Sequence, residues 1–263
     1  MTDLGELRKT LTVPAERYTA LLLLGHAAVL VWTLLLLIGR MSFPSYFISV
    51  VLIKAIIALK ILPASSRKVE LHERGLRVEE FGGLRTVAFE QLEAYYLAAF
   101  PRLLPLPGEG RVARHLRLDG GGVMVTIPDD LVGFDELLER VVEAVDRHVA
   151  PGIEERYEAG EVVGFGPVRV GREQGLEVPD YLAQFTGKRS GGAQRRTLRW
   201  LEVAPAEIKA GLLRLGKTGL VPLGLVPNLH LLAALLSRQG VQISGLEAIL
   251  GGADDMAAPA TVQ

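Results

Sequence analysis

The segment from Thr19 to Leu62 constrains this chain most, because its 44 residues contain no Asp or Glu. Only Arg40, Lys54 and Lys60 carry a charge there. Two apolar runs fill the segment. The first, Thr19 to Ile38, has 20 uncharged residues, and a helix of that length rising about 1.5 Å per residue matches the roughly 30 Å core of a bilayer.

The second apolar run, Tyr46 to Leu62, holds Lys54 near its middle. A lysine there costs about 2.5 to 3.5 kcal/mol of insertion free energy, whereas each Leu, Ile, Val or Phe contributes about 0.3 to 0.6. The summed insertion free energy of the apolar side chains exceeds the cost of the lysine by a narrow margin. The link from Gly39 to Ser45, with the helix breaker Pro44, is too short for a domain. The pattern predicts a two-helix transmembrane hairpin over residues 19–62, after an N-terminal segment of residues 1–18.

Basic residues at the ends of the two runs predict the orientation of this hairpin. One side holds Arg8, Lys9, Arg17, Arg67 and Lys68, whereas the other side holds Arg40 alone. The positive-inside rule then puts both termini and the following domains in the cytoplasm. A cleaved signal peptide is the rival interpretation of the first run, but acidic residues precede this run and a second apolar run follows it.

His26 and Lys54 are the polar exceptions within the two apolar runs. Counted back from the turn, they lie within roughly 5 Å of the same depth. Ionisable residues inside a membrane are functional candidates, so the pair predicts an intramembrane polar contact or a proton site. The alternative is that Lys54 extends toward the headgroups or faces a partner helix.

Residues after Leu62 contain four short signatures that occur twice in the same order. They are Gly-Leu-x-Val at 75–78 and 175–178, Thr-x-x-aromatic at 86–89 and 197–200, Leu-Arg-Leu at 116–118 and 213–215, and an apolar residue before proline at 127–128 and 221–222. The copies differ by insertions near residues 101–114 and 179–196. Each copy is predicted to form short antiparallel strands followed by one helix. This helix spans residues 134–149 in the first copy and 228–239 in the second.

This arrangement resembles the PH-like membrane proteins of bacteria, whose function is uncharacterised. The likeness rests on the apolar hairpin, on Glu-Leu-His-Glu-Arg-Gly-Leu-Arg-Val at 70–78, on Thr-Val-Ala-Phe at 86–89 and on the closing helix. It implies an α+β fold of two tandem PH-like split barrels, each closed by a C-terminal helix, over residues 67–150 and 157–239. It also implies an integral protein of the bacterial inner membrane. Residues 251–263 are expected to be a disordered tail.

Two further motifs have competing interpretations. Gly219 to Leu236 lacks charged side chains and is an alternative third membrane span, although Pro222 and Pro227 argue against a helix there. Gly211 to Thr218 matches the P-loop pattern of nucleotide-binding proteins letter for letter. The repeat places this stretch on a strand hairpin instead, so nucleotide binding is the remote alternative.

Catalytic and metal-binding patterns are missing from the sequence. It has no cysteine, its five histidines are scattered, and no serine lies in a Gly-x-Ser-x-Gly motif. With 29 basic and 30 acidic residues, a dedicated nucleic-acid binder is disfavoured. We therefore expect no enzyme activity, no catalytic residue, no cofactor, no metal and no nucleic-acid partner.

The best candidate contact surface is a basic segment in the second copy. It contains Lys188, Arg189, Arg195, Arg196 and Arg199, with no acidic residue between Tyr181 and Leu201. Such residues attract anionic lipid headgroups, although a solvated loop explains the same composition. The leading hypothesis is a membrane-anchored binding or scaffolding protein with the bilayer, its headgroups or an unidentified protein as partner. The alternative is an accessory subunit of a membrane transport or envelope assembly.

Overall fold

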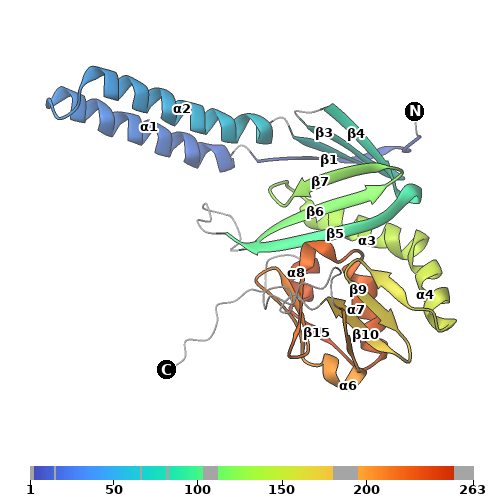
Figure 1. The fold of residues 1–263 in the computed structure, drawn as a ribbon. Coiled ribbons are helices and arrows are strands. Elements are labelled where there is room, and N and C mark those ends of the chain that lie inside the picture. Colours follow the sequence, from blue (N-terminus) through green and yellow to red (C-terminus); the bar gives the residue numbers. More distant parts are fainter. Residues whose placement is uncertain are drawn as a thin grey trace.

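A computed structural model describes residues 3–14, 16–65, 67–80, 83–102, 112–179 and 195–251. A helical hairpin projects from one end of a body of sheets (Figure 1). The hairpin consists of α1 (Glu16–Leu37) and α2 (Phe43–Ser65). Its helices pack closely at Gly25, where an added Cβ would lie 2.1 Å from Ile57 Cδ1, and Thr33 Oγ1 lies 3.2 Å from Tyr46 Oη.

The first half of the body has two antiparallel sheets and two helices. The first sheet has the order β1-β2-β3-β4, formed by Leu7–Thr12, Lys68–His72, Gly75–Glu80 and Gly83–Ala88. After the short helix η1 (Phe89–Gln91), the second sheet contains β5 (Leu92–Pro101), β6 (Val112–Gly120) and β7 (Val123–Pro128). Helix α3 (Phe134–His148) follows and buries its apolar face in the core, and α4 (Ala150–Glu158) continues from it.

The second half repeats this plan with shorter strands. One sheet has the order β11-β10-β9-β8, from Arg195–Leu198, Gly175–Pro179, Val168–Gly171 and Val163–Phe165. Helix α6 (Trp200–Val203) leads into β12 (Ala206–Lys209), β13 (Leu212–Leu215), β14 (Gly219–Pro222) and η2 (Leu223–Leu225). Helix α7 (Leu229–Arg238) closes this half, β15 (Ile243–Ser244) pairs parallel with β12, and α8 (Glu247–Leu250) ends it.

The repeated sequence signatures fall on corresponding elements. Gly-Leu-x-Val begins β3 and β10, and Leu-Arg-Leu lies on β6 and β13. The apolar residue and proline end β7 and β14, shortly before α3 and α7. A single apolar core contains residues of both halves, among them Leu97, Val141, Leu213 and Leu232. The two halves are therefore packed against one another rather than strung along a linker.

The predicted transmembrane hairpin is wrong in its membrane assignment. Among the helices of the described residues, none has the length and apolar character that a membrane crossing needs. Lys54 already left only a narrow margin for the second run, and both His26 and Lys54 are exposed on their helices. The assignment to the bacterial inner membrane, with cytoplasmic termini and domains, loses its basis with this finding.

The predicted split barrels are also wrong. Strands in the described part of the chain form four open sheets with linear orders. Closure of the first half would require a hydrogen-bond ladder between β4 and β7. The Arg85 side chain donates to the Met124 carbonyl at 2.6 Å there, and no ladder joins the two strands. The sheets therefore meet through side chains at this edge.

The chain ends differ from the expected organisation. Within residues 1–18, expected to be an N-terminal segment, Leu7–Thr12 forms β1 and pairs with β2, so the hairpin emerges between two neighbouring antiparallel strands. At the other end, β15 and α8 extend the second half beyond residue 239. The predicted disordered tail lies outside the described residues except for Gly251.

Candidate functional site

Most of the exposed large apolar side chains of the described chain lie on the helical hairpin. Large aliphatic and aromatic side chains are exposed along both helices, and Leu37 and Leu59 each retain 75% of their accessible surface. The exposed set comprises Leu22, Leu23, Leu24, Leu30, Val31, Leu34, Leu37, Phe43, Phe47, Ile48, Val51, Leu52, Ile56 and Leu59. We call this set the hairpin surface. Contiguous apolar surface of this kind marks an interaction site, because its exposure to water is unfavourable.

His26 and Lys54 are both exposed on the hairpin. The Nδ1 atom of His26 lies 2.7 Å from the carbonyl oxygen of Leu22 in its own helix, and the Lys54 side chain is exposed. Thr33 of α1 and Tyr46 of α2 make a polar contact between the two helices. A contact of His26 with Lys54 stays a prediction.

The basic segment is only partly described. Lys188 and Arg189 lie outside the described residues. Arg195 and Arg196 are exposed on β11, and Arg199 is exposed just before α6. Arg195 lies 4.0 Å from Glu177 of β10, which offsets part of its charge. Contact of this basic segment with anionic headgroups stays a prediction.

The P-loop letters lie on two turns at opposite ends of one strand. Gly211 precedes β13 and Gly216 follows it, so their backbone amides cannot wrap one phosphate. Lys217 and Thr218 lead into β14, whereas a P-loop lysine and threonine open a helix. This geometry is that of two consecutive hairpins.

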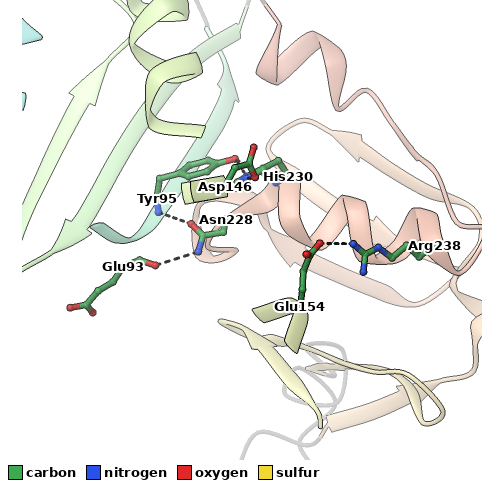
Figure 2. Close-up of polar contacts among 7 residues, drawn as sticks. All are labelled: Glu93, Tyr95, Asp146, Glu154, Asn228, His230 and Arg238. Carbon is green, nitrogen blue, oxygen red and sulfur yellow. Dashed lines mark hydrogen bonds and ion pairs between the residues drawn. The ribbon is translucent and has the colours of Figure 1, made fainter. Parts of the chain in front are cut away.

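The densest polar contact between the halves centres on Asn228, a residue with only 4% exposure (Figure 2). Its Oδ1 accepts from the Tyr95 amide at 3.0 Å, its Nδ2 donates to the Glu93 carbonyl at 3.4 Å, and its amide donates to the Tyr95 carbonyl at 2.8 Å. Asn228 has φ +50° and ψ +50°, a left-handed conformation that Asn tolerates better than most residues. Asn228 thus forms hydrogen bonds with backbone groups on the outer edge of β5, and it also precedes the first residue of α7.

His230, two residues further on, joins three elements. Its Nδ1 lies 2.7 Å from the Tyr95 hydroxyl of β5, and its Nε2 lies 2.9 Å from Asp146 Oδ1 of α3. The rings of Tyr95 and His230 stack with centroids 5.4 Å apart (Figure 2). Burial lowers the pKa of His230, while Asp146 opposes this effect. Burial also raises the pKa of Tyr95, so this phenol stays protonated.

The hydrogen-bonded chain of Tyr95, His230 and Asp146 has the sequence of groups found in proton relays. It lacks the open access to a substrate that an active site needs. Tyr95 has 0% exposure, so a substrate cannot reach its hydroxyl. A catalytic nucleophile must face a cleft where a reacting atom can sit. The arrangement therefore serves to hold the two halves together.

An ionic contact and a hydrogen bond also join the two halves. Arg238 of α7 pairs with Glu154 and, at 3.4 Å, with Glu158 of α4 (Figure 2 shows the contact with Glu154). At a second place the buried Arg114 of β6 donates to the Ile249 carbonyl of α8 at 3.2 Å. Both contacts join residues that are far apart in the sequence.

Ligand and metal sites are not evident in the described residues. No group of three or more metal-ligating side chains occurs there. A groove of about 630 Å³ lies beside α7 and β15, but small and apolar residues line most of it and its one ionisable lining residue is the exposed Glu247. The groove offers no converging polar groups that would select a ligand.

A family model described as "Family of unknown function (DUF6585)" matches residues 1–244 of the chain. The chain belongs to this family. The match to the DUF6585 family covers the hairpin, all four sheets and α7, so these parts form one family unit. No curated protein and no solved structure matches the chain.

The junction in this DUF6585 member was not predicted from the sequence. Tyr95 and His230 are separated by 135 positions, and His230 looks like one of five scattered histidines. One signal was available, because Asn228 and His230 follow Pro227 at the start of a helix in the second copy. The corresponding place in the first copy has Gly133 before α3, without a comparable polar pair.

Proposed function

We propose that this protein is a non-catalytic scaffold whose hairpin surface binds apolar helices. In the purified protein these are the helices of a second copy of the chain. The exposed apolar side chains of α1 and α2 carry this proposal.

A second copy fits the hairpin surface because identical hairpins would not repel each other strongly. From Phe43 to Leu59 the charged residue is Lys54, and the exposed side chains around it are aliphatic or aromatic. Two hairpins packed together give a four-helix arrangement, a common solution for burying apolar helix faces. A two-fold contact also uses the same surface on both copies, which is the usual geometry of a homodimer.

Light scattering on the purified full chain tests this function. The variant Leu34→Gln, Ile48→Gln, Leu52→Gln changes three exposed hairpin residues, and Leu84→Gln, Val132→Gln, Leu201→Gln changes three exposed apolar residues elsewhere. Burial of one such side chain contributes about 1.5 to 3 kcal/mol, so the hairpin variant should weaken the dissociation constant by at least about a hundredfold. The control variant should associate like the natural chain.

Two results would contradict the proposal. One is a natural chain that stays monomeric at all concentrations tested. The other is binding to neutral phospholipid vesicles that is lost in the hairpin variant, because lipid and not a protein surface would then cover the hairpin.

A further inference from the structure

His230 contacts one titratable group on each of two elements of the first half. Tyr95 approaches from β5 and Asp146 from α3, whereas His230 itself belongs to α7 of the second half. The His230 side chain is 13% exposed and that of Asp146 is 54% exposed. The imidazole therefore lies at the contact between the halves, with a buried phenol on one side and a solvated carboxylate on the other.

The neutral imidazole satisfies every partner in this contact. With its proton on Nε2, the ring donates to Asp146, and Nδ1 accepts from the Tyr95 hydroxyl. The backbone amide of His230 also points to the same hydroxyl oxygen at 3.5 Å. The phenol thus donates one hydrogen bond and accepts a second, weaker one.

Protonation of His230 removes the acceptor of the Tyr95 hydroxyl. Nδ1 then carries a proton that points at the phenol oxygen 2.7 Å away, and the described residues offer this hydroxyl no other acceptor. A buried donor without a partner is unfavourable. The new charge also lies in the first turn of α7, where the helix dipole opposes a cation. The ion pair with Asp146 is half solvated, so it offsets these costs only in part.

We propose that the contact of Tyr95, His230 and Asp146 is a pH-sensitive latch, in which protonation of His230 loosens α7 from β5 and weakens the association of the two halves. The contact of Arg114 with Ile249 does not depend on this proton. The latch therefore changes how tightly the halves are held and does not separate them. It does not depend on what binds the hairpin surface.

Burial lowers the pKa of His230 below its usual value near 6.5, which agrees with this direction. The folded form then binds fewer protons than the unfolded form, so the stabilisation is complete above pH 6.5 and is lost as the pH falls. Burial lowers the pKa of His115 in the same direction. Global stability therefore cannot separate the two histidines, and the test must be local.

Amide hydrogen exchange at pH 7.5 and 5.0, corrected for the intrinsic rates, supplies this local test on the full chain. The amides of Tyr95 and Asn228, which bond across the contact, should lose part of their protection at the lower pH. In His230→Gln, whose amide reproduces the neutral ring, the protection should not change with pH. His148→Gln, at an exposed histidine of α3, should behave like the natural chain.

A histidine titration by NMR on the natural chain completes the experiment and does not depend on any variant folding. The protection of the Tyr95 and Asn228 amides should fall over the same pH range in which His230 becomes protonated. Tyr95→Phe should raise the pKa of His230, because no hydroxyl is left without an acceptor. The latch is excluded if His230 titrates while the protection of Asn228 stays constant, or if His230→Gln keeps the pH response.

Discussion

At the scale of single residues, Asn228 shows how one side chain can serve two structural needs. Its left-handed backbone turns the chain from η2 into α7, and its carboxamide pairs with the backbone of β5. Sequence alone suggests the helix start, because Asn is common near helix N-termini. It cannot reveal the partner strand, which lies 133 positions earlier.

Replacement of Asn228 by Ala and by Gly should separate these two contributions. Both variants lose the bonds to the Tyr95 amide and the Glu93 carbonyl, at about 1 to 3 kcal/mol for an unsatisfied buried group. Asn228→Ala should lose about 1 kcal/mol more than Asn228→Gly, because alanine is strained at φ +50°. Urea unfolding measures both free energies.

Ser237→Ala on the exposed side of α7 serves as the control and should stay within about 0.5 kcal/mol of the natural chain. Equal stability of Asn228→Ala and the natural chain would show that neither the conformation nor the bonds matter.

At the scale of elements, alternating side chains and turn residues located most of the strands. The two Leu-Arg-Leu stretches lie on β6 and β13, and the P-loop letters are turns, as the repeat indicated. Strand β1 gave no comparable signal, because four of its six residues are charged or polar and its pairing with β2 spans the hairpin. The open sheets could not be predicted either, because local patterns do not show whether two sheet edges meet.

Gly211, in the turn between β12 and β13, should not tolerate a side chain. It has φ +80°, and an added Cβ would lie 2.1 Å from the Ala99 carbonyl of β5. Gly211→Ala should therefore lose about 2 to 4 kcal/mol of unfolding free energy, from backbone strain and the displaced strand. Circular dichroism during urea unfolding gives this value.

Gly152 in α4 offers the matched control, because nothing lies within 4 Å of its added Cβ. Gly152→Ala should equal the natural chain or gain up to about 1 kcal/mol, since alanine favours helix. A similar loss in both variants would mean that the Gly211 turn does not press on β5.

At the scale of the whole molecule, the hairpin is an insertion between neighbouring strands. Thr12 of β1 pairs with Lys68 of β2, so the chain leaves and re-enters the first sheet at one place. Sequence analysis recovered the hairpin from its apolar runs but assigned its exposed side chains to a membrane. Hydropathy measures how much a segment prefers an apolar environment, and it does not identify what provides that environment.

Replacement of residues 14–66 by Asn-Gly should therefore leave the sheets folded. The dipeptide suits a two-residue turn that joins Val13 to Arg67 and continues the pairing of β1 with β2. A shorter loop also lowers the entropic cost of bringing β1 and β2 together. The variant should therefore match the natural chain or gain up to about 2 kcal/mol of unfolding free energy. It should be monomeric in light scattering at concentrations where the natural chain associates. A variant that aggregates or unfolds would show instead that the hairpin helps to hold the sheets together.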